Sequence, residues 1–178
     1  MKKSIIYLGS ILLLVVSISC KSEASLQKYY IDNEGDKNFR QFDIPASILT
    51  LKEDASPESK EALASLKKLN ILAFVRDGSN EAQYANEDTK VKAILKNSKF
   101  KELMRVKDKG RNIIVKYEGD DDTMDEVIVY AKDQAQGFAL VRVLGDKMDP
   151  AKIVKLANSI SDVDSDGFKQ LEGLFKIK

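Results

Sequence analysis

The sequence has no histidine, no tryptophan and a single cysteine among its 178 residues. The absence of histidine excludes catalytic triads or dyads with an imidazole base, and it excludes histidine-ligated metal centres. One cysteine excludes an internal disulfide and the cysteine clusters of structural zinc sites. Three prolines and nine glycines leave no breaker-rich linker that would divide the chain. We therefore expect one domain, no cofactor and no enzymatic activity.

Neither sign of charge is in excess. The chain has 29 lysines and arginines against 28 aspartates and glutamates, a formal net charge of +1. Hydrophobic residues make up 43% and charged residues 32%, a composition typical of a globular domain with a core of its own. Because nucleic-acid binders carry a strong basic excess, we expect no nucleic-acid partner.

The first nineteen residues predict a signal peptide. Lys2 and Lys3 precede an apolar run from Ile5 to Val16, and three small or apolar residues, 17–19, follow that run. The run is shorter than the ~20 residues that a transmembrane helix requires. A cleaved export signal is therefore the better interpretation, and it indicates that the mature chain is exported.

Cys20, the single cysteine, stands where a bacterial lipoprotein signal is cleaved and acylated. Ser17 departs from the leucine usual at that position of the lipoprotein motif, and an ordinary signal peptide with a chance cysteine is the alternative. The acylated Cys20 would hold the chain on the membrane surface without spanning it. Lys21, in place of the aspartate typical of inner-membrane retention, favours the outer membrane and leaves its face open.

The periodicity of apolar residues predicts an α+β domain. Helical spacing predicts helices at 26–30, after Ser56-Pro57, from Asn86 or Asp88 onward, after Asp149-Pro150 and at 168–175. Alternating or compact apolar segments predict strands at 39–44, 69–75, 104–107, 111–117, 126–131 and 138–144. The short loops among the later strands predict an antiparallel meander.

These elements predict an antiparallel or mixed sheet with a meander in the C-terminal half and helices packed on one face. The expected division of the chain is a signal peptide at 1–19, a lipidated cysteine and tether at 20–35, and a single α+β domain at 36–178.

Three segments carry a resemblance to a known family: FDIPASILTL (42–51), LNILAFV (69–75) and DEVIVYAKDQAQGFALVRVLGDKMDPAKIVKLA (125–157). Together they resemble an uncharacterised family of Bacteroidota lipoproteins catalogued as domain of unknown function 4252. The resemblance lies in the hydrophobic positions. It implies an envelope lipoprotein associated with sigma-factor regulators, and it transfers neither an activity nor a catalytic residue.

The segment from Asp162 to Gly167 matches the start of a calcium-binding loop, because Asp162, Asp164 and Asp166 alternate before a glycine. The twelfth position of such a loop is normally glutamate, and Gly173 occupies it here. The alternative is an acidic N-terminus of the last predicted helix, where carboxylates favour the helix dipole.

Basic residues gather in segment 90–116, and the following residues 118–126 are acidic. Lys96, Lys99, Lys101 and Arg105 are the candidate members of a basic face that would bind lipid phosphates or an anionic glycan. A solvated surface without a binding role is the alternative.

The sequence thus leads to two hypotheses of function. The first is a non-catalytic protein-binding module, held to the membrane by its N-terminal lipid, that binds an unknown protein or envelope component in envelope signalling or a stress response. The second is a module that binds lipid or anionic glycan through segment 90–116.

Overall fold

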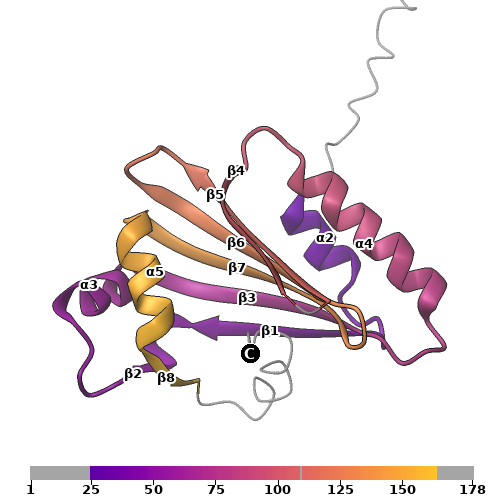
Figure 1. The fold of residues 1–178 in the computed structure, drawn as a ribbon, viewed down its shortest axis with the longest axis horizontal. Helices are drawn as coiled ribbons and strands as arrows, with labels where there is room; N and C mark the ends of the chain where they lie inside the picture. Colours follow the sequence, from indigo (N-terminus) through magenta and orange to yellow (C-terminus); the bar gives the residue numbers. More distant parts are fainter. Residues whose placement is uncertain (1–24, 109, 164–178) are drawn as a thin grey trace, which may run out of the picture.

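The structure is a computed structural model that describes residues 25–108 and 110–163 (Figure 1). Its elements, in chain order, are α2 (Leu26–Asp32), β1 (Phe39–Pro45), the 3-10 helix η2 (Ala46–Ile48), β2 (Leu49–Leu51), α3 (Pro57–Ser65), β3 (Leu66–Val75), α4 (Glu81–Leu95), β4 (Lys101–Asp108), β5 (Arg111–Gly119), β6 (Met124–Asp133), β7 (Gly137–Met148), α5 (Pro150–Ser159) and β8 (Ile160–Val163).

Within the described residues, the strands form a six-stranded sheet of order β1-β3-β7-β6-β5-β4 and a two-stranded sheet of β2 and β8. Every neighbouring pair is antiparallel. The run from β4 to β7 is a meander, in which each strand pairs with the next along the chain. The predicted α+β class and the C-terminal-half meander are confirmed.

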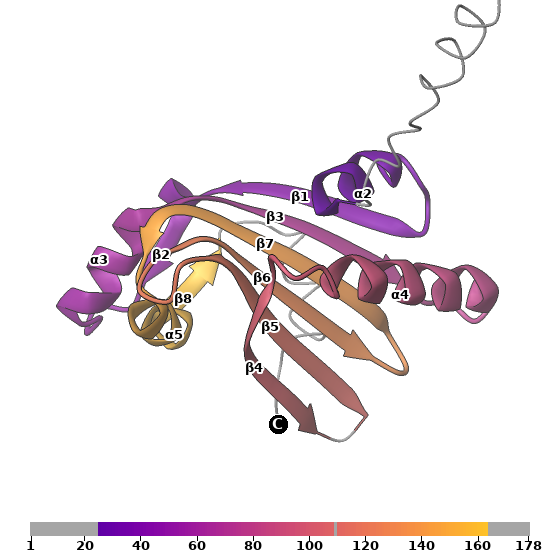
Figure 2. The same cartoon turned by 90° about the horizontal axis from the view of Figure 1, so that it is seen from above.

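Helices lie on both faces of the large sheet (Figure 2). Leu72 and Phe74 of β3 belong to the core beneath α2 and α4, whereas Ile71 and Ala73 belong to the opposite core, against which Leu63 of α3 packs. Successive residues of a strand point to opposite faces of the sheet, and in β3 the residues on both faces are apolar. Each face of the sheet therefore needs a covering layer of helices. The expectation of helices on one face therefore differs from the structure.

Aromatic rings form the centre of the core beneath α2 and α4. The ring of Phe74 lies 5.1 Å from that of Phe39 and 5.6 Å from that of Phe138. Tyr130 and Tyr84 also contact Phe138, at 5.6 and 6.2 Å. These rings come from four strands and α4, so the cluster joins the helix to the sheet.

Helix α4 begins six residues earlier than Asn86 would place it, which corrects that prediction. Its N-cap is Asn80, whose side chain donates to the carbonyl of Val75 and so closes the turn after β3. Asp88 lies mid-helix and faces the sheet, where Tyr130 and Lys132 of β6 bind its carboxylate. The helix predicted at 168–175 lies outside the described residues.

We expect Gly137 to be far less replaceable than Gly78. Both have a positive φ, of 122° and 81°. A Cβ at Gly78 would meet open space, whereas one at Gly137 would overlap the carbonyl oxygen of Phe74 on the neighbouring strand. Gly78→Ala should lower the free energy of unfolding by ~1 kcal/mol, from backbone strain alone, and Gly137→Ala by ~3 kcal/mol. Urea unfolding measures both, and equal losses would contradict the packing at β3 and β7.

Candidate functional site

Two neighbouring carboxylates of α4, Glu87 and Asp88, are buried beneath the helix. Glu87 accepts a hydrogen bond of 2.9 Å from the hydroxyl of Tyr29 on α2, and Lys90 pairs with it at 2.7 Å. Burial, followed by the hydrogen bond to Glu87, raises the pKa of Tyr29 far above its ordinary value. The Tyr29 hydroxyl therefore stays protonated and joins the two helices.

Asp88 joins α4 to the sheet. It accepts a hydrogen bond from the hydroxyl of Tyr130 on β6, and the ammonium groups of Lys132 and Lys92 lie 2.7 Å from its carboxylate. Burial acts to raise the pKa of Asp88, but hydrogen bonds from Lys132, Lys92 and Tyr130 outweigh it and hold the pKa below its ordinary value. Asp88 is therefore a charged anchor at neutral pH.

Tyr30 anchors α2 to the middle of the sheet. Its hydroxyl lies 2.6 Å from the carbonyl oxygen of Leu140 on β7 and 3.0 Å from that of Asn70 on β3. The guanidinium of Arg142 lies over its ring, 5.6 Å from the centroid, and binds Glu126 of β6 through two hydrogen bonds. Sequence reasoning missed this pair. The one feature of the sequence that could have indicated it is Arg142 itself, a charged residue within the apolar segment 138–144.

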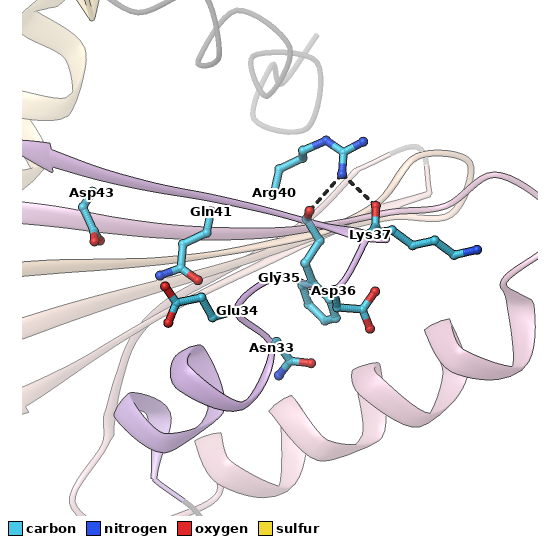
Figure 3. A pocket seen from close by; sticks show the side chains of 9 residues that line it. Asn33, Glu34, Gly35, Asp36, Lys37, Arg40, Gln41 and Asp43 are labelled. Carbon is cyan, nitrogen blue, oxygen red and sulfur yellow. Dashed lines mark hydrogen bonds between the residues drawn. The ribbon is translucent and has the colours of Figure 1, made fainter.

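Three surface hollows surround α2. One lies between the α2–β1 turn and β1, with a volume of about 520 Å³ (Figure 3). A second, of about 360 Å³, lies beside Tyr30 and includes Asp43, Lys68 and Arg142. The third, also about 360 Å³, lies between α2 and α4 and includes Lys28, Lys90 and Ile94. The surface near the start of the described chain is therefore indented on several sides of α2.

Side chains of both charge signs line the hollow in Figure 3, and several are already engaged. Asp36 accepts hydrogen bonds from the backbone of Asn38 and from Gln83. The guanidinium of Arg40 donates to the carbonyls of Lys37 and Phe39. Among the described residues, no group of three or more acidic, histidine or cysteine side chains is placed to hold a metal ion. The hollow is suited to polar contacts with a ligand.

The basic residues predicted to form a binding face are spread over the end of α4, the loop that follows it and β4, and three of the four are paired. Lys99 lies 2.8 Å from Glu118, and Lys101 lies 2.8 Å from Asp121. Arg105 binds Glu102 through two hydrogen bonds. The structure thus brings the basic segment against the acidic segment 118–126, and their charges offset each other. Lys96 is exposed at the C-cap of α4, apart from these pairs. Binding of lipid or glycan by this segment stays a prediction.

The other predicted site residues fall largely outside the described part of the chain. Cys20 lies outside it, as do Asp164 and Asp166. Asp162 lies on β8, where its backbone stands opposite Thr50. Lipidation and calcium binding therefore both stay predictions. Among the described helices, none combines the length and the apolar character that a membrane crossing requires.

We predict that Asp88→Asn lowers the free energy of unfolding at pH 7 by about 1–3 kcal/mol, because buried hydrogen-bond partners lose a charged acceptor. The lowered pKa of Asp88 implies a stabilising contribution that is present above the unfolded-state pKa of ~3.9 and lost as pH falls through the folded-state pKa. The variant should therefore lose less stability than the wild type on acidification. Urea unfolding at several pH values tests this, with the exposed Asp122→Asn as the control. Equal acid sensitivity in all three would refute it.

Comparison with known proteins identifies a family and no close relative. No curated protein and no solved structure matches this chain. The model of a domain of unknown function, DUF4252, matches residues 29–156. That range begins within α2 and ends within α5, so it includes the whole six-stranded sheet, all of α4 and the second half of α2. The chain therefore belongs to the DUF4252 family.

Proposed function

We propose that this protein is a lipid-anchored, non-catalytic module of the bacterial cell envelope that binds a protein partner. Its membrane is the outer membrane of a Bacteroidota-type cell, and its role lies in envelope signalling or a stress response. The leader 1–19 and the single cysteine at its end support the anchor. Family membership is consistent with this proposal but carries no activity.

The observation that carries the binding role is the free edge of β4. Within residues 25–108 and 110–163, this strand is the last of the large sheet, and β5 is its one pairing partner. Leu103 and Met104, in its middle, are 36% and 46% exposed. A register shift between Glu102 and Met104 places an extra residue there. An extended segment of a partner can add a strand to such an edge, with backbone hydrogen bonds for affinity and side chains for specificity.

The opposite edge of the sheet is less suited to strand addition. That edge is β1, which ends in Pro45, a residue without an N–H to donate. Arg40, Gln41 and Asp43 are its exposed polar side chains. Lysines and bulges also protect edges against aggregation, and β4 carries both. Protection against aggregation does not explain why two adjacent apolar residues, Leu103 and Met104, are exposed on this strand.

We expect Cys20→Ala to abolish incorporation of labelled palmitate in cells, because Cys20 is the only thiol in the chain. Ser22→Ala, a substitution two residues away, is the control and should keep the label. Gel autoradiography of the immunoprecipitated protein gives the readout. Label that persists in Cys20→Ala would overturn the lipid anchor.

We expect Leu103→Asp combined with Met104→Asp to weaken partner binding at least about tenfold, the equivalent of ~1.4 kcal/mol. A photo-crosslinking residue at Met104 should form a discrete adduct in intact cells, and one at Val154 on α5, 49% exposed, should not. Immunoblotting reveals the adducts. The same adduct from both positions, or undiminished binding by the double variant, would remove β4 from the proposal.

A further inference from the structure

We propose that the outer surface of α2, together with the C-terminal half of α4, rests on the anionic membrane that carries the anchor, and that Ile31 enters its headgroup region. This inference rests on the proposed acylation of Cys20, and it adds the surface that faces the bilayer. It separates the molecule into a membrane-facing layer and a partner-facing edge.

The first support is the shortness of segment 20–25, the part of the predicted tether that precedes α2 and is called the tether from here on. Five peptide units join Cys20 to Ser25, the N-cap of α2, so these two residues lie at most ~18 Å apart in any conformation. Strand β7 has 12 residues, which span ~40 Å. The domain is thus about twice as long as its tether. An acylated Cys20 keeps the start of α2 close to the bilayer.

The second support is the exposed apolar residue that follows the tether. Ile31 is 61% exposed, although it lies on a helix of only seven residues. The inner face of α2 is occupied by Leu26, Tyr29 and Tyr30, and Ile31 points away from it, beside the hollow next to Tyr30. A large aliphatic side chain at this place is suited to the boundary between headgroups and acyl chains.

The third support is the hollow between α2 and α4, which lie side by side over the same face of the sheet (Figures 1 and 2). Ser25, where the tether ends, lines this hollow together with Ala93 and Ile94. Lys28 and Lys90, with side chains 57% and 52% exposed, also line it. In a bilayer the acyl chains lie beneath the phosphates, so the apolar groups of this surface can contact the acyl chains while its ammonium groups contact the phosphates.

Acidic groups temper the electrostatic part of this contact. Asp32 pairs with Lys28 at 2.7 Å, and Glu34 is exposed just beyond the helix. The attraction to anionic lipid is therefore modest, with Lys96 at the C-cap of α4 adding to it. Ile31 and the short tether provide most of the orientation.

This orientation leaves β4 accessible. The Tyr30 hydroxyl places α2 over β3 and β7. Strand β4 lies at the far edge of the sheet, three strand spacings from β7, which is a distance of ~14 Å. The membrane contact and the proposed strand addition therefore use separate surfaces.

The composition of the chain allows a direct test, because it contains no tryptophan and one cysteine. The chain from Cys20 onward is coupled through that thiol to a maleimide lipid in vesicles of phosphatidylglycerol and phosphatidylcholine. Ile31→Trp provides the fluorescent reporter, and Val154→Trp, on the opposite face, is its matched control. On coupling, the emission of the Ile31→Trp variant should shift to shorter wavelength and be quenched by brominated lipids, whereas the control should show neither change.

A second measurement uses the chain without a tryptophan. On the same vesicles, Lys28 and Lys90 should be protected from an amine-acylating reagent relative to Lys107 on β4, and Ile31→Asp should remove that protection, as read by mass spectrometry. Quenching of both tryptophan variants or of neither, or equal acylation of all three lysines, would overturn the proposed orientation. Because the coupling is chemical, these outcomes are independent of palmitate labelling in cells, which tests the anchor itself.

Discussion

The helical layer of α2 and α4 depends on carboxylates and hydroxyls buried between it and the sheet. Asp88 holds α4 to β6 through Tyr130 and Lys132, while Glu87 holds α2 to α4 through Tyr29. A buried charge is tolerated only where hydrogen bonds replace its hydration, so each group fixes its partners in one arrangement. The hollows around α2 and the outward position of Ile31 follow from that arrangement.

The sequence predicted the elements whose signals are local. Alternating apolar residues separated by short loops revealed the meander, and Ser56-Pro57 marked the start of α3, where the Ser56 side chain caps the helix. Strands β2 and β8 were missed because they are short and pair across more than 100 residues, as Leu49 with Val163. The start of α4 was misplaced because Asp88 resembles a helix cap, and its true partner, Tyr130, is 42 residues away.

The candidate surfaces were less predictable than the fold. A sequence shows that residues 90–116 are basic and 118–126 acidic, but the ion pairs between Lys99 and Glu118 and between Lys101 and Asp121 depend on how β4 and β5 align. The exposure of Met104 likewise depends on β4 being an edge strand, which is a property of the complete sheet. The pairing of strands that are distant in sequence determines both the ion pairs and the exposure of Met104. No local pattern of residues predicts that pairing.

The hydrogen bond between Tyr30 and the carbonyl of Leu140 has a consequence for the order of folding, because it spans 110 residues. Contacts of such long sequence separation form late, after the intervening chain has collapsed. Under the export that we propose, the amino terminus would emerge first, and α2 would have no place to dock until β7 had followed. The proposed acylation of Cys20 would then take place before the helical layer closes on the sheet.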